Sequence, residues 1–214
     1  MLFEVAELVK DIRVALDHNN NSEALLDLGD IDTLMLDEVI KSKIADAARI
    51  VEQNAPVYML EGGKDFANSV AWTGEVGKSS GFIHLPDDFL RLVSFKMSDW
   101  DKSVSSVITD DHPLYDLQSS RYPGIKGNPQ NPIVAIVTMP IGQVLEFYSC
   151  TGGEHVFIQR SRYIPIPKIA DEQIDICAKL RDAVVYYAAS LVAQTIVHAD
   201  LAANLLNVSN ELQK

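Results

Sequence analysis

The sequence predicts an α+β protein in which helices from both ends of the chain form a bundle and a β-rich part is inserted between them. Apolar residues recur at helical spacing in the first 56 and the last 44 residues, whereas the middle holds eight of the nine prolines and alternates short β-type runs with turns. The 214-residue chain is 47% hydrophobic, which is enough to build a core in one or two domains. We therefore divide it into N-terminal helices (1–56), a β-rich insertion (57–170) and C-terminal helices that complete the bundle (171–214).

Helical periodicity defines the N-terminal part. A first helix is expected over residues 2–16, and the polar run 17–22 ends it because short polar side chains compete for backbone hydrogen bonds. A second helix is expected to begin at Thr33 or Leu36 and to end at Gln53, just before a proline.

The C-terminal part carries the widest apolar face. Asp171 is expected to be the N-cap or a first-turn acid of a long helix whose apolar face runs from Ile174 to Thr195. Residues 198–200 are expected to mark a kink or a new start. The last helix then has an apolar face made of Leu201, Leu205, Val208 and Leu212.

The insertion is expected to hold several short strands. They are Gly81–Leu85, Leu90–Lys96, Ile133–Met139, Val144–Tyr148 and a segment near His155–Ile158, with a short helix at Pro113–Ser120. Residues 121–132 contain three prolines and two glycines and are expected to be a loop, and residues 140–143 a hairpin turn. Loops 61–80 and 119–132 are poorly suited to an isolated core, so we expect them to order against a partner.

The net charge argues against a protein that binds phosphate groups over a broad basic surface. The net charge is −12 and the pI about 4.7, so no general basic surface is available for nucleic acid. Seven acids and no Lys or Arg lie between Asp17 and Glu38, a pattern most typical of a solvated loop and helix face.

The cysteine and hydropathy patterns suggest a reducing compartment and no membrane. Cys150 and Cys177 are far apart in the sequence, and the N-terminus is acidic and amphipathic, unlike a signal peptide. The most apolar run, Ala183 to Val197, is too short and too polar to span a bilayer and indicates a buried helix.

No motif points firmly to chemistry. The glycine-rich run 74–81 lacks the first glycine of a phosphate loop, because Trp72 stands at that position. The adjacent residues 110–112 (Asp-Asp-His) cannot all face one ion from a regular element, and Asp87-Asp88 suits a turn. We therefore expect no catalytic residue, no cofactor, no metal and no enzyme. A hydrolase whose site is assembled from distant residues, such as His84, Asp110 and His112, is a remaining alternative.

Aromatic side chains concentrate in the insertion. Because few Lys or Arg residues are interleaved with them, core packing or a protein interface fits them better than nucleic-acid stacking. The candidate partner-contact residues are Trp72, Phe82, Phe89, Trp100, which looks exposed at a strand end, Tyr122, and, from the C-terminal helices, Leu191 and Leu205.

Four pieces of sequence carry a resemblance to a known family. They are residues 36–44 with Ala47-Ala48-Arg49, residues 85–92 (LPDDFLRL) with Trp100, the loop Gly127-Asn128-Pro129, and residues 162–167 (RYIPIP) before the C-terminal helices. In this order they resemble the head–tail adaptors, also called head-completion or connector-ring proteins, of tailed bacteriophages, especially crAss-like and short-tailed phages.

The resemblance implies a structural virion protein. It implies a homo-oligomeric ring of about twelve copies that binds the portal protein and neighbouring tail or second adaptor proteins and closes the DNA-filled head. Genomic DNA would pass through without specific binding, and the protein would lie at the head–tail junction after assembly in the host cytoplasm. The alternative is an acidic soluble protein-interaction module without a role in viral assembly.

Overall fold

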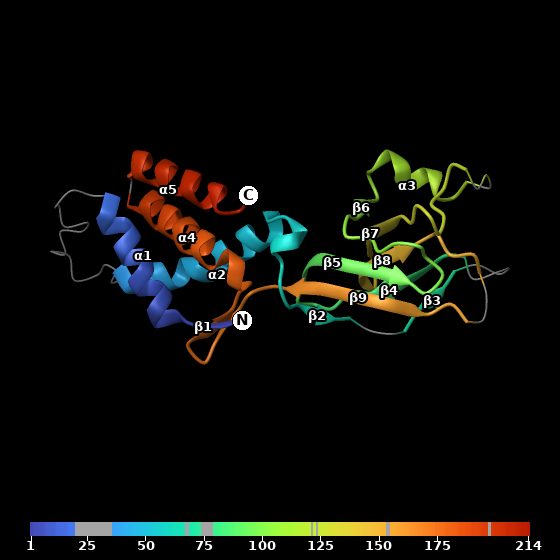
Figure 1. Cartoon of the computed structure of the whole chain (residues 1–214), viewed down its shortest axis with the longest axis horizontal. Helices are drawn as coiled ribbons and strands as arrows, with labels where there is room; N and C mark the ends of the chain where they lie inside the picture. Colours follow the sequence, from blue (N-terminus) through green and yellow to red (C-terminus); the bar gives the residue numbers. More distant parts are fainter. Residues whose placement is uncertain are drawn as a thin grey trace. The chain divides into compact units, whose positions relative to one another are not determined.

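The chain forms two compact units (Figure 1). The computed structural model describes residues 1–19, 36–66, 69–73, 79–120, 122, 124–152, 155–196 and 198–214. The helical unit comprises residues 1–62 and 166–214, and the β-rich unit comprises residues 63–165. The predicted α+β class, with helices at both ends and a β-rich centre, is confirmed.

In the helical unit, three helices pack on a fourth. The helices are α1 (Val5–Asn19), α2 (Leu36–Asn54), α4 (Arg181–Thr195) and α5 (Ala199–Glu211), and α1, α2 and α5 each contact α4. Because α4 has neighbours on several sides, it is apolar nearly all round. Its buried residues are Ala183, Val184, Val185, Ala188, Ala189, Ser190, Val192 and Ala193.

Two helix starts expected from the sequence are wrong. Residues 2–4 form strand β1 (Leu2–Glu4), which pairs with β11 (Gln173–Asp175), and β11 also pairs with β10 (Ile169–Ala170). Asp171 and Glu172 have φ angles of 51° and 57°, so they make a left-handed turn and cannot start a helix. A 3₁₀ turn, η2 (Ala178–Leu180), then leads into α4, which begins ten residues after Asp171. Ile174 and Cys177, whose spacing suggested a helix, are buried in β11 and in the segment that follows it.

The β-rich unit contains two sheets. One has the strand order β2 (Lys64–Asp65), β9 (Ile158–Pro165), β5 (Phe89–Met97), and the other has the order β3 (Ala71–Trp72), β4 (Gly81–His84), β8 (Gly142–Phe147), β7 (Val134–Met139), β6 (Ile108–Thr109). Among these described strands, β6 and β7 are parallel and the other pairs are antiparallel. Most predicted strands are confirmed within one or two residues, and Met139 pairs with Gly142 across the predicted hairpin turn.

The last strand lies later than expected. The sequence suggested a strand near residues 155–158, whereas β9 runs from 158 to 165. Its alternation is hidden in the sequence because the buried positions include Ser161, between the exposed Arg160 and Arg162, followed by Tyr163. Residues of this kind do not form a conspicuous apolar run.

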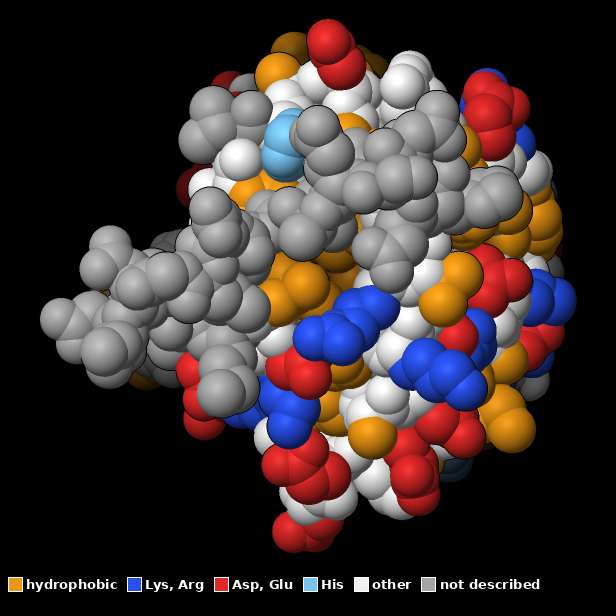
Figure 2. Space-filling model, turned by 90° about the vertical axis from the view of Figure 1, so that its left-hand side faces the viewer, with side chains coloured by type: hydrophobic (Ala, Val, Ile, Leu, Met, Phe, Trp, Pro, Cys, Tyr) orange, Lys and Arg blue, Asp and Glu red, His pale blue; other side chains and the backbone are white. Residues whose placement is uncertain are grey.

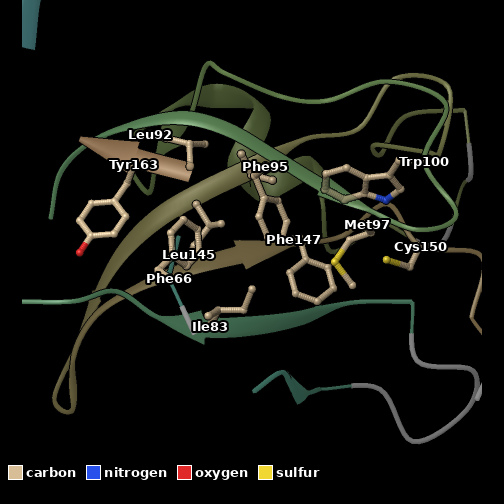
Figure 3. Packing of buried hydrophobic residues seen from close by; sticks show 11 residues of the cluster. Phe66, Ile83, Leu92, Phe95, Met97, Trp100, Leu145, Phe147, Cys150 and Tyr163 are labelled. Atoms are coloured by element: carbon tan, nitrogen blue, oxygen red, sulfur yellow. The ribbon is translucent and has the colours of Figure 1, made fainter. Parts of the chain in front are cut away.

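Side chains from both sheets share one core (Figure 3). Phe95 of β5 packs edge-on against Trp100, with ring centroids 5.5 Å apart, and is 6.0 Å from the ring of Phe147 on β8. Phe66 stacks on Phe95 at 6.1 Å and meets Tyr163 of β9 edge-on at 5.9 Å. The two sheets therefore face each other across an aromatic core.

Gly63 begins the β-rich unit at a position that only glycine suits. Its φ is +87°, and an added Cβ would lie 2.5 Å from the carbonyl oxygen of Tyr163. This close approach lets β2 join the edge of β9, where Lys64 pairs with Tyr163. The units divide at 62/63 and 165/166, a few residues from the divisions expected at 56/57 and 170/171. The second division lies before residue 170 because β10 pairs with β11, which pairs with β1 of the helical unit.

Candidate protein-interaction site

The short helix α3 (Pro113–Leu117) of the β-rich unit and the loop after it expose several apolar side chains. His112 starts the helix, since its Nδ1 accepts a hydrogen bond from the Leu114 N–H at 3.1 Å and Pro113 occupies the first helical position. We call the apolar residues that α3 and the following loop expose the α3 surface. These residues are Leu114 (40% exposed), Leu117 (40%), Tyr122 (61%) and Ile125 (48%).

The other side of α3 is held on the sheet by two tyrosines. Tyr115 meets Tyr148 edge-on, with ring centroids 6.3 Å apart, and both hydroxyls donate to the same carboxylate oxygen of Glu146, that of Tyr115 at 3.0 Å. Burial, followed by hydrogen bonding to Glu146 in the case of Tyr148, raises the pKa of both tyrosines. The hydroxyls therefore stay protonated and keep donating, which holds α3 in place.

The loop after α3 is anchored by a buried glutamine. Gln118 is 6% exposed; its Oε1 accepts from the Gly127 N–H at 2.9 Å, and its Nε2 donates to the Leu114 carbonyl at 2.7 Å. Asn128 then closes a turn, because its Oδ1 accepts from the backbone N–H groups of Gln130 and Asn131, each at 3.0 Å. Hydrogen bonds within the chain thus hold the second half of the predicted loop.

A groove with an acidic rim lies between α1 and α4, and we call it the acidic groove. Its volume is about 480 Å³, and it is lined by Asp11, Val14, Ala15, Arg181, Asp182, Val185 and Tyr186. Arg181 hydrogen-bonds both to Asp11 and, at 3.1 Å, to Asp182. Val14 is 59% exposed beside them. The groove thus combines accessible apolar surface with two carboxylates and one guanidinium.

A second groove lies between α2 and α4, and we call it the basic groove. Its volume is about 330 Å³, and it is lined by Lys43, Asp46, Arg49, Ile50, Leu191, Gln194 and Thr195. Arg49 is 3.8 Å from Asp46, and both side chains are about half exposed. Among the residues that the structure describes, no carboxylate forms an ion pair with Lys43. The groove therefore has one net positive charge next to the half-buried Ile50 and Leu191.

Most of the net negative charge belongs to the helical unit. Its residues include 19 acids and nine bases, whereas the β-rich unit has 11 acids and nine bases. Figure 2 looks onto one face and shows acidic and basic side chains beside one another, with hydrophobic side chains between them. Most of the acidic stretch between Asp17 and Glu38 lies outside the described residues.

The predicted partner-contact residues divide into three groups. Trp100 and Leu205 are 2% and 0% exposed, so they belong to the cores of their units and are not available on the surface. Tyr122 lies on the α3 surface and Leu191 in the basic groove. The remaining three, Trp72, Phe82 and Phe89, are half-buried at the margins of the β-rich core.

The three candidate surfaces also contain apolar residues that the sequence did not single out. Val14 and Tyr186 line the acidic groove, Ile50 the basic groove, and Leu114 and Ile125 the α3 surface. Val14 interrupts the polar face of α1, which is a recognisable signal in a helical wheel. The exposure of the other four residues depends on how neighbouring elements pack, so it cannot be predicted from their spacing in the sequence.

The candidate chemical groups have structural partners. Asp88 accepts hydrogen bonds from Lys64 at 2.8 Å and from the Tyr163 hydroxyl at 2.7 Å, and the bond from Lys64 lowers the pKa of its carboxyl. His112 caps α3, and His84 packs edge-on against the Phe82 ring with centroids 5.7 Å apart. Within the described ranges, no three His, Cys, Asp or Glu side chains gather into a potential metal site. Residues 74–78 of the glycine-rich run lie outside these ranges.

Both cysteines are free and buried. Burial raises the pKa of each thiol to about 12, with added repulsion from Asp99 at Cys150 and from Glu52 at Cys177. Glu52 is itself 2% exposed; its Oε1 accepts from the Cys177 N–H at 2.8 Å, and burial raises the pKa of its carboxyl. The thiols are thus protonated at neutral pH, which is unfavourable for a nucleophile.

No protein-family model matches the chain, and no curated protein matches it. Of the helices that the structure describes, none is both long enough and apolar enough to cross a membrane. The interaction surfaces therefore have to be interpreted from their own chemistry.

Proposed function

We propose that this chain is a structural protein of a tailed-phage particle, an adaptor that joins the portal to the tail and closes the DNA-filled head. It acts as a ring of about twelve copies and performs no catalysis. The observation that carries the proposal is the α3 surface, where four large apolar side chains are exposed on one helix and the loop after it. Large apolar side chains that are exposed within such a short stretch of chain are typical of protein interfaces.

The resembling sequence pieces have structural roles in the fold, which supports the proposal. Asp88 in the turn of residues 85–92 hydrogen-bonds Lys64 and Tyr163, and Gly127 and Asn128 hold the second half of the loop after α3. Residues 162–167 finish β9 and lead back to the helical unit. These pieces therefore form a turn, a loop and a strand end that the chain itself stabilises.

The charge distribution is compatible with a channel for DNA. The helical unit carries a net −10 from its 19 acids and nine bases. A like-charged wall weakens contacts with phosphates, so DNA would slide along it instead of binding. We therefore infer that acidic side chains of the helical unit line the channel, and we assign the α3 surface to the portal or to the next tail protein.

Light scattering of the purified chain mixed with a candidate portal ring tests the proposal. We expect about one copy of the chain bound per portal subunit, and weaker binding when Tyr122 and Ile125 are both changed to Ser. The matched control is Ile141→Ser, since Ile141 is 60% exposed in the hairpin turn, away from the α3 sequence. If the chain does not bind the portal and instead binds a host protein at one-to-one stoichiometry, the alternative of an acidic interaction module is supported.

A further inference from the structure

The acidic and basic grooves lie on opposite sides of the same helix. In the acidic groove α4 contributes residues near its start, including Asp182 and Val185, and in the basic groove it contributes residues near its end, including Leu191 and Gln194. Val185 and Gln194 are nine residues apart, which is two and a half turns of an α-helix, so they point in opposite directions. One copy of the helical unit thus presents two different grooves on two different faces.

The two grooves are complementary in charge. The acidic groove has the carboxylates of Asp11 and Asp182 against one guanidinium, and the basic groove has Lys43 and Arg49 against one carboxylate. Asp182 is 70% exposed, so its carboxylate remains accessible in spite of its bond to Arg181. Opposite net charges on two separate faces favour contact between the grooves and disfavour contact of either groove with itself.

The grooves also match in apolar character. The acidic groove presents Val14 and the half-buried Tyr186, and the basic groove presents Ile50 and Leu191. Contact between them would remove these side chains from water while the charges at the rim fix the register.

We propose that the occupant of the acidic groove is the α2–α4 face of a second copy of this chain. The contact is head-to-tail: every copy offers its acidic groove to one neighbour and its basic groove to another. Such a heterologous contact generates a closed ring when its rotation closes. This inference rests on the proposed function in taking the ring as the final assembly, but the contact itself follows from the two grooves.

Charge reversal within the full-length chain tests the contact. Sedimentation velocity over a concentration series should show that the wild-type chain self-associates, and that Asp182→Lys and Lys43→Glu each weaken the association at least about tenfold. A chain carrying both changes should recover, because each contact again joins opposite charges. Asp200→Lys and Lys10→Glu are the matched controls: Asp200 also lies in the first turn of a helix, Lys10 is an exposed helical lysine, and neither lines a groove.

The outcomes separate this inference from the proposed function. A monomeric wild-type chain, or reversal variants that associate like the controls, or a double variant that does not recover while its circular dichroism is native, overturns the groove contact. If that chain still binds the portal, the adaptor proposal stands without the contact. If the grooves mediate self-association but the portal is ignored, the contact stands and the adaptor proposal fails.

Discussion

Replacing Gln118 by Met should destabilise the β-rich unit by about 2 kcal/mol. The two side chains have similar length and volume, so the substitution removes the amide group and leaves the packing nearly unchanged. The amide makes two hydrogen bonds, one with the Gly127 N–H at 2.9 Å and one with the Leu114 carbonyl at 2.7 Å. These bonds anchor the loop that carries half of the α3 surface.

The magnitude depends on what happens to the two backbone groups. Gly127 is buried, so its N–H would lose its partner where water has little access, which costs about 1–3 kcal/mol. Leu114 is 40% exposed, so water can replace the lost bond to its carbonyl at a cost of about 0.5 kcal/mol or less. The sum is about 2 kcal/mol, most of it from the orphaned glycine N–H.

Tryptophan fluorescence during urea unfolding measures this effect in the right unit. The chain has two tryptophans, Trp72 and Trp100, and both belong to the β-rich unit. The control is Ser119→Ala, which removes an exposed hydrogen bond to the Asp116 carbonyl and should change the free energy of unfolding by less than about 0.5 kcal/mol. A Gln118→Met chain as stable as this control would refute the reasoning.

Three further predictions concern stability. Leu205→Ala should cost about 2–5 kcal/mol, because Leu205 is fully buried, whereas Val208→Ala, at a site 41% exposed, should cost less than about 1 kcal/mol; thermal unfolding followed at 222 nm compares them. Gly63→Ala should cost about 1–3 kcal/mol because of its positive φ and the close carbonyl of β9, and Gly124→Ala, with open space around its Cβ, is the control; urea unfolding distinguishes them, and equal stability would contradict the geometry. Glu52→Gln should remove a pH dependence. Burial raises the pKa of Glu52, so the stability that its protonated form contributes is present below the ordinary pKa of a glutamate and is lost as the pH rises through the folded-state pKa. The melting temperature of the variant should therefore rise relative to that of the wild type as the pH increases through that range. A difference in melting temperature that stays constant with pH would contradict the prediction.

The Leu205 prediction also changes how a C-terminal truncation must be interpreted. From its spacing, Leu205 was a candidate partner contact, but α5 buries it together with Leu201 and Ala202, and Ser209 Oγ donates to the Ala183 carbonyl of α4 at 2.8 Å. Deleting the chain from Asp200 onward would expose the apolar surface of α4. Loss of assembly in such a truncation would therefore report unfolding of the bundle, and the groove variants are the sharper test.

Local sequence determined the elements whose signal is periodic. Helix α2 begins at Leu36, one of the two expected starts, and the hairpin of β7 and β8 turns at residues 140–141, within the expected range 140–143. Such signals can be found in the sequence because apolar spacing and turn residues act within a few positions of the chain. The start of α4 could not be found in this way. The side chains of Ile174 and Cys177 are buried in the expected order, but pairing between β1 and β11, more than 160 residues apart, holds them in a strand and its exit.

The candidate contact residues also differ in whether sequence or tertiary structure determined their role. The sequence alone determined that this acidic chain is α+β, and it singled out Leu191 and Tyr122, together with Trp100, Leu205 and three other residues, as candidates for contact. Only the tertiary structure decided that Trp100 and Leu205 are core residues while Leu191 lines a groove. The physical reason is that burial in the core and burial against a partner both remove apolar surface from water, so the residue type does not distinguish them. Whether a side chain is exposed depends on which neighbours the fold packs against it.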